Sequence, residues 1–172
     1  MQFDYQPNLT GELLELRPLR NDDFTALYAV ASDPLIWQQH PVSNRWDETV
    51  FHSFFDESLA SGGALIATDK KTNDIIGSSR YHGYNDMASE IEIGWTFLAK
   101  KYWGGTYNGE MKRLMLHHAF QYVQSVVLLV GQSNIRSQHS VKKVGGKHDG
   151  IRRNGSGLES YLYRIRRPEV NG

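Results

Sequence analysis

Residues 90–130 contain the pattern that most restricts the fold, because a strand, a loop, a helix and a second strand follow one another directly. EIEIGWTF (90–97) alternates apolar and charged residues up to Gly94, as a half-buried strand does. SVVLLV (125–130) is a continuous apolar run, typical of a strand buried on both faces. The apolar positions between Met111 and Val123 have helical spacing. A crossover of this kind joins two parallel strands, which indicates a mixed α/β domain.

The remaining elements place this pair inside a mostly antiparallel twisted sheet. We expect about four helices and one domain covering residues 1–172. The segments expected to form the other elements are a strand at 13–19, a helix from Asn21 to before Pro34, a helix capped by Asp47 and ending at Gly62-Gly63, a hairpin of 64–69 and 74–84, a helix near 135–144, and strands near 147–153 and 159–166 joined by the turn NGSG.

Composition excludes several classes of function. The 172 residues include no cysteine, which excludes disulfides and cysteine nucleophiles, and the seven histidines show no metal-ligand spacing, so we expect no metal. The 19 basic and 19 acidic residues balance, and charges on a solvated hairpin account for the basic run KKVGGKHDGIRRN. We therefore expect neither nucleic acid nor membrane as a partner. The absence of a signal peptide or long apolar run predicts a cytoplasmic protein.

The loop KKYWGGTYN (100–108) lies between the alternating strand and the following helix. Its two adjacent glycines have two possible interpretations, and the residues alone do not decide between them. They are either a tight turn that needs unusual backbone angles, or a loop whose N–H groups bind an anion at a helix N-terminus. The loop lacks the GxxxxGK[ST] pattern of a Walker A motif and the spacing of a dinucleotide fingerprint.

Four short motifs follow one another in the chain: Glu92-Ile93-Gly94-Trp95, KYWGGT (101–106), NIRS (134–137) and KVG (143–145). Taken in order, they resemble the Gcn5-related N-acetyltransferases (GNAT family), within them the RimJ/RimL-like branch. Glu92-Ile93-Gly94-Trp95 is similar to the family's Glu-x-Gly-aromatic element, and residues 101–106 (KYWGGT) are similar to its (Q/R)xxGx(G/A) loop. NIRS (134–137) and KVG (143–145) resemble the segment after the family's fifth strand. The loop departs at Lys101 and Thr106, and Gly146 stands where the family usually has an aromatic residue.

This resemblance implies acetyl-CoA as cofactor and transfer of its acetyl group to a primary amine by direct attack. Glu92 is then the candidate general base, acting directly or through water, and a solvated strand carboxylate is the alternative reading of this residue. Glu90, on the same face, is the fallback. In many relatives a tyrosine protonates the leaving thiolate, and Val141 stands at that position here. The resemblance to the RimJ/RimL-like branch implies that Ser137 takes this role instead. A helix first-turn serine that satisfies a backbone donor is the alternative reading of Ser137. The residues implied to bind the cofactor are Trp95, Thr96, Phe97, Lys101, Trp103, Gly104, Gly105, Thr106, Tyr107, Asn108, Asn134, Ser137 and Lys143.

The acceptor is a small-molecule amine or a peptide N-terminus under this reading. We expect its site to be lined by aromatic residues and a histidine, namely Trp37, His40, Tyr81 and Tyr84, although core packing explains such aromatics equally well. Two rivals stay open: a non-catalytic acyl-CoA-binding or regulatory module of the same fold, and a nucleic-acid-binding domain that uses the C-terminal basic hairpin. The sequence allows a homodimer and a monomer alike.

Overall fold

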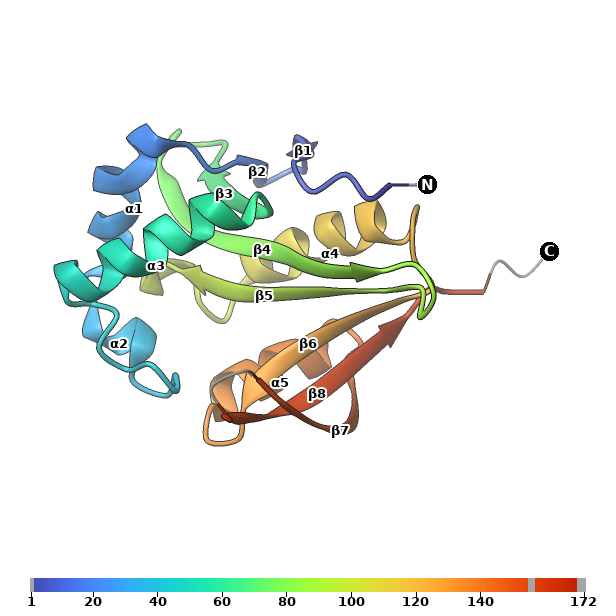
Figure 1. Cartoon of the computed structure of the whole chain (residues 1–172). Coiled ribbons are helices and arrows are strands. Elements are labelled where there is room, and N and C mark those ends of the chain that lie inside the picture. Colours follow the sequence, from blue (N-terminus) through green and yellow to red (C-terminus); the bar gives the residue numbers. More distant parts are fainter. Residues whose placement is uncertain (1, 155–156, 170–172) are drawn as a thin grey trace.

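The computed structural model describes residues 2–154 and 157–169, and its eight-stranded sheet has helices on both faces (Figure 1). The elements in chain order are β1 (Leu9–Thr10), β2 (Leu14–Pro18), the 3₁₀ helix η1 (Asn21–Asp23), α1 (Phe24–Ala31), α2 (Pro34–Trp37), α3 (Glu48–Ser61), β3 (Ala64–Asp69), β4 (Ile75–Asn85), β5 (Glu90–Leu98), the 3₁₀ helix η2 (Lys100–Tyr102), α4 (Thr106–Ala119), β6 (Ser125–Gly131), α5 (Ile135–Lys143), β7 (Lys147–Arg153) and β8 (Glu159–Arg166).

The sheet has the strand order β1-β2-β3-β4-β5-β6-β8-β7, which confirms the expected fold class. Within the described residues, β5 and β6 are the parallel pair, and α4 is the crossover helix between them. Their pairing covers Glu90–Glu92 against Ser125–Val127 and then stops. Beyond that point the two strands diverge, as Figure 1 shows.

Most expected elements are present with nearly the expected bounds. Asp47 caps α3 by accepting from the N–H groups of Thr49 and Val50, and Gly62 ends that helix with a φ of 68°. Three elements were not expected: β1 has two residues, η2 has three and α2 has four, so all are too short to show a periodic pattern. Asn21 opens a 3₁₀ turn before α1. Of the expected NGSG turn, residues 155 and 156 lie outside the described residues.

Two hydrophobic clusters cover the two faces of the sheet. One joins the sheet to α4 and α5 through residues such as Leu65, Met111 and Met115. The other joins it to α1, α2 and α3 through residues such as Ile66 and Phe51. Leu65 and Ile66 are neighbours on β3 and belong to opposite clusters, as the alternation of side chains along a strand requires. Within the described residues, no helix is long and apolar enough to span a membrane.

Buried carboxylates fix the N-terminal end of α4 and the loop before it. Glu110 accepts from the backbone N–H groups of residues 12, 13 and 14 at 2.8 to 2.9 Å, which attaches α4 to the start of β2. Asp69, at the end of β3, accepts from the hydroxyls of Tyr102 at 2.7 Å and Tyr107 at 3.3 Å. The glycine loop between these tyrosines is therefore attached to the sheet on both sides.

Candidate functional site

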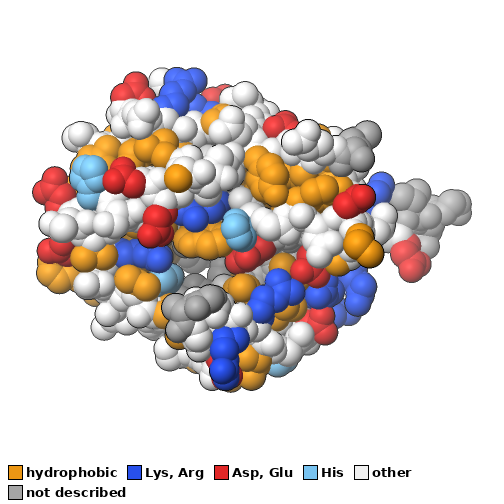
Figure 2. Space-filling model, in the orientation of Figure 1, with side chains coloured by type: hydrophobic (Ala, Val, Ile, Leu, Met, Phe, Trp, Pro, Cys, Tyr) orange, Lys and Arg blue, Asp and Glu red, His pale blue; other side chains and the backbone are white. Residues whose placement is uncertain are grey.

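A cavity of about 1010 Å³ opens where β5 and β6 diverge. Its walls come from β5, β6, the loop before α4, α5, the segment after α2 and the β7–β8 hairpin. Figure 2 shows this side of the molecule, where Lys, Arg and His side chains surround a hollow with hydrophobic side chains between them. Elements far apart in sequence thus contribute to one site.

A bulge in β5 sets the shape of the cavity. Trp95 has a φ of 51°, in the left-handed region that bulky residues rarely adopt, and the β4–β5 register shifts between Ser78 and Arg80 opposite it. Because pairing with β6 ends at Glu92, the backbone of β5 beyond this point has no ladder partner on the β6 side. Gly94 precedes Trp95, and a glycine inside a strand often marks a bulge of this kind.

The Gly104-Gly105 loop presents backbone donors to the cavity. Gly104 has a φ of 67°, which explains a glycine at this position, and Gly105 is the N-cap of α4. Among the described residues no side chain caps the helix, so its first N–H groups are left available at the positive end of the helix dipole. Both glycines line the cavity. The loop has the geometry of an anion cradle as well as that of a turn.

The structure brings most of the predicted cofactor residues together. Ten line the cavity: Trp95, Thr96, Phe97, Trp103, Gly104, Gly105, Asn108, Asn134, Ser137 and Lys143. Three lie outside its lining: Lys101, Thr106 and Tyr107. Lys101 is exposed with its ammonium over the ring of Tyr102, and Tyr107 points to Asp69. The side chains of Lys101 and Tyr107 thus contact Tyr102 and Asp69 rather than the cavity.

Glu92 lies at the position where the two parallel strands part, and its side chain lines the cavity. Burial raises the pKa of this carboxyl to about 7, although Arg152 and Arg80 oppose the shift. Its neighbours Ile91 and Ile93 are fully buried on the other face of the strand. Within the described residues, the carboxyl accepts no hydrogen bond and forms no ion pair. Glu92 is therefore a partly protonated, unengaged group at neutral pH.

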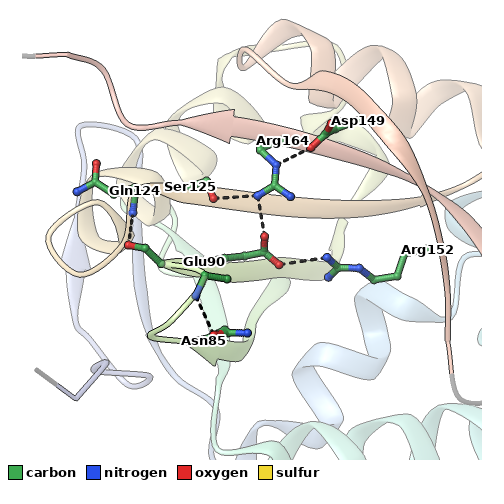
Figure 3. A network of polar contacts seen from close by, with 9 residues as sticks. Asn85, Glu90, Gln124, Ser125, Asp149, Arg152 and Arg164 are labelled. Atoms are coloured by element: carbon green, nitrogen blue, oxygen red, sulfur yellow. Dashed lines mark hydrogen bonds and ion pairs between the residues drawn. The ribbon is translucent and has the colours of Figure 1, made fainter.

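Glu90 has a different environment, shown in Figure 3. Its carboxylate accepts from Arg152 at 3.1 Å and from Arg164 at 2.6 Å, and Arg164 also bonds Ser125 and Asp149. Although burial acts in the opposite direction, these two guanidinium groups hold the pKa of Glu90 below its usual range. A carboxylate engaged in this way is a poor proton acceptor, so the fallback base is structural.

Ser137 and Asn134 lie at the start of α5. Asn134 is buried and accepts from the Ser137 N–H at 3.2 Å, which makes it the N-cap. Ser137 lines the cavity, and its hydroxyl makes no hydrogen bond within the described residues. The asparagine, rather than the serine, thus satisfies the helix donor. Val141, in place of the tyrosine, is buried and also lines the cavity.

The four residues predicted for the acceptor site divide into two pairs. Trp37 and His40 line the cavity. Tyr81 is 1% exposed and donates to the Met115 carbonyl at 2.7 Å, and Tyr84 donates to Asp86 at 2.9 Å, so both lie outside the lining. Both tyrosines pack around Phe3 in the first hydrophobic cluster. The core reading accounts for this pair.

Several basic residues of the cavity were missed from the sequence. The lining contains six cationic side chains against the carboxylate of Glu92: Arg45, Lys112, Arg113, Arg136, Lys143 and Arg152. Lys112 is 5% exposed, and its Nζ lies 2.5 Å from Thr96 Oγ1. Arg136 lies over the ring of Trp103 at 3.9 Å and donates to the carbonyl of Ile36, which joins α5 to α2. Helical spacing with Met115 and Ala119 is a signal that could have identified Lys112.

The described part of the chain contains no group of three or more His, Cys, Asp or Glu residues able to hold a metal. Comparison of the sequence with protein families gives a match to the acetyltransferase (GNAT) domain over residues 14–147. The chain belongs to the GNAT family. This match extends from β2 to the start of β7, and it makes the protein an acetyltransferase of a family that uses acetyl-CoA. A search of curated proteins found no match.

Solved GNAT structures share the fold at low sequence identity. An N-acetyltransferase from Brucella melitensis has a TM-score of 0.81 at 16% identity, with 94% of this chain and 79% of that chain covered. An acetyltransferase from Bacillus anthracis has a TM-score of 0.76 at 19% identity, with 93% of this chain and 98% of that chain covered. Mycobacterium smegmatis RimJ in complex with CoA-disulfide has a TM-score of 0.69 at 19% identity, with 99% of this chain and 93% of that chain covered. At these identities the likeness establishes the fold.

Proposed function

We propose that this GNAT protein transfers the acetyl group of acetyl-CoA to a primary amine, with Glu92 as the general base. The observation that carries the proposal is the unengaged, half-buried carboxyl of Glu92 in the cavity, with a pKa of about 7. A base with its pKa near the working pH combines a useful ionised fraction with enough basicity. An amine acceptor must lose a proton before or during attack, and this group can take it directly or through one water.

The residues of the cavity fit acetyl-CoA. The uncapped N–H groups at Gly105 and the start of α4, together with Arg113 and Lys143, suit the phosphates. The unpaired edge of β5 from Trp95 to Phe97 suits an extended amide chain that adds to the sheet as a strand would. Bound acetyl-CoA supplies a thioester carbonyl as the electrophile. The diverging strands leave room for it between Glu92 and α5.

The chain's own groups then move two protons. Glu92 accepts one from the amine nitrogen as the new C–N bond forms. As the C–S bond breaks, the Ser137 hydroxyl, which lines the cavity without a hydrogen-bond partner in the described part of the chain, is the donor that we propose for the departing sulfur. Solvent then returns a proton to Ser137 and removes the proton from Glu92. Backbone N–H groups of the β5 bulge can donate to the carbonyl oxygen, a type of contact worth about 3 kcal/mol in other acyl-transfer enzymes. We also propose membership of the RimJ/RimL-like branch, for which the sequence motifs are the support.

The test is acetyl-CoA binding by calorimetry together with CoA release over a panel of primary amines. We expect binding to both the wild-type protein and Glu92→Gln, and amine-dependent CoA release from the wild type alone. Binding without release for any amine would instead support the non-catalytic acyl-CoA-binding module. Absence of binding would remove the cofactor assignment and the enzyme function with it.

A further inference from the structure

Acetyl-CoA binding does not explain the guanidinium group of Arg45, which lies at the end of the cavity against α2 and α3. Arg45 lines the cavity in the segment after α2, and its guanidinium lies over the rings of Phe54 at 4.5 Å and Trp37 at 5.6 Å. These rings belong to the cluster under α1 to α3, on the opposite face of the sheet from α4. The glycine loop proposed for the phosphates is at the α4 side.

Arg45 and His40 form a pair of hydrogen-bond donors. The Nδ1 atom of His40 accepts from the Val42 N–H at 3.0 Å, which assigns the ring proton to Nε2. Burial and the nearby Arg45 lower the pKa of His40 to about 4, so the ring is neutral at pH 7. His40 Nε2 then faces Arg45 Nη1 at 3.3 Å with a proton on each atom. Two donors cannot satisfy each other, and an acceptor placed beside them would satisfy both.

Arg80 adds a second positive charge behind this pair. Its side chain is 6% exposed, its guanidinium stacks on Trp95 at 4.3 Å, and its Nη2 donates to Ser58 at 2.6 Å. Its Nε is buried without a hydrogen-bond partner among the described residues. Burial and Arg80 together lower the pKa of Arg45 to about 10. Glu57 and Glu92 act on Arg80 from a distance, but in the described part of the chain neither forms an ion pair with it or with Arg45.

We propose that the acceptor is an amine that also carries a negatively charged group, a carboxylate or a phosphate, and that Arg45 with His40 binds this group while Glu92 receives the proton of the amine. The inference rests on the proposed function and specifies its substrate class. An anion at this position would neutralise the excess charge of Arg45 and Arg80 and accept from both unsatisfied donors. The guanidinium of Arg45, which lies over the rings of Trp37 and Phe54, has the planar set of donors that suits a two-point contact with such a group.

The test uses matched amines that differ in the negative group: β-alanine with propylamine, phenylalanine with phenethylamine, and O-phosphoethanolamine with ethanolamine. CoA release is measured for the wild type, Arg45→Gln, Arg45→Lys and the control Arg166→Gln, which removes a charge from an exposed position outside the cavity lining. We expect the charged member of at least one pair to have a KM lower by about tenfold or more, a preference that Arg45→Gln abolishes, Arg45→Lys partly restores and Arg166→Gln leaves intact.

A binding measurement separates this inference from the proposed function. The CoA-saturated protein is titrated calorimetrically with the acetylated form of each amine. Preferential binding of the charged products, lost in Arg45→Gln, supports the anion site even if no amine is turned over. Turnover without any charge preference would leave the enzyme function intact and overturn the inference. Weaker acetyl-CoA binding in Arg45→Gln with unchanged acceptor preference would also overturn it, since Arg45 would then contact the cofactor.

Discussion

At the scale of single residues, we expect Glu92 to control the pH dependence of the proposed reaction. Its pKa is about 7, and the base acts only when ionised, so kcat/KM should rise with pH to a plateau with a midpoint near 7. Glu92→Gln should lower the plateau by about 100-fold or more and remove this midpoint. A pH–rate profile of both proteins checks the prediction. An unchanged midpoint in the variant would show that another group is the base.

Lys112 is a second residue whose charged form is destabilised by burial in the folded protein. Burial lowers the pKa of its ammonium to about 7, whereas in the unfolded chain it is near 10.4. Below pH 7 the folded protein buries the charged ammonium of Lys112, which lowers the free energy of unfolding by the full desolvation cost. This cost falls as pH rises from about 7 to 10, because the folded protein then releases the Lys112 proton while the unfolded chain retains it. Lys112→Met should therefore increase the free energy of unfolding, and by more at pH 6 than at pH 9.5.

Urea unfolding of the wild type and Lys112→Met at the two pH values measures this difference. The hydroxyls of Ser79 and Thr96 still bond each other at 2.8 Å after the substitution, so no buried donor is orphaned. Exposed Lys147→Met is the matched control and should show no pH-dependent gain. A gain of equal size at both pH values would contradict the explanation by charge burial.

At the scale of elements, the loop before α4 depends on the backbone angle of Gly104. Its φ of 67° is forbidden to proline and accessible to asparagine. We expect Gly104→Pro to abolish acetyl-CoA binding and Gly104→Asn to retain it within about tenfold, because a Cβ there meets nothing within 4 Å. Calorimetric titration of both variants decides, and equal binding by both would mean that the loop does not shape the cofactor site.

The elements themselves were mostly predictable from local patterns. The alternation in β5, the apolar run of β6 and the capping signals of α3 are properties of short segments, and each is where the sequence indicated. The missed elements, β1, η2 and α2, have two, three and four residues and depend on what they pack against. Among the site residues, Glu92 and the glycine loop followed from motifs. Arg45 and Arg136 were missed because a surface arginine and a cavity arginine look alike in sequence.

At the scale of the whole molecule, Glu90 joins the two halves of the sheet. β5 and β6 share three paired positions, and Glu90 adds ion pairs to Arg152 of β7 and Arg164 of β8 (Figure 3). Glu90→Gln should lower the free energy of unfolding by about 1–3 kcal/mol at pH 7. Because the pKa of Glu90 is lowered in the fold, this contribution exists above pH 4.5 and is lost as pH falls further.

Denaturant unfolding at pH 7 and at pH 3.5 tests the role of Glu90. Glu159→Gln, which removes the exposed pair of Glu159 with Arg153 in the same hairpin, is the control and should cost no more than about 1 kcal/mol. Equal losses for the two variants would argue that Glu90 is an ordinary surface charge.

The amino-acid sequence by itself determined the order and type of the main elements, the parallel strand pair and the glycine loop, because these follow from periodicity, capping and backbone restrictions within a few residues. The tertiary structure alone decided which charges share the cavity. Glu90 and Glu92 are two positions apart on one face of β5, yet their pKa values shift in opposite directions. Ion pairs with arginines of β7 and β8 lower the pKa of Glu90, whereas burial raises the pKa of Glu92 to about 7. The pKa of each carboxyl depends on neighbours more than fifty residues away, which no local pattern records.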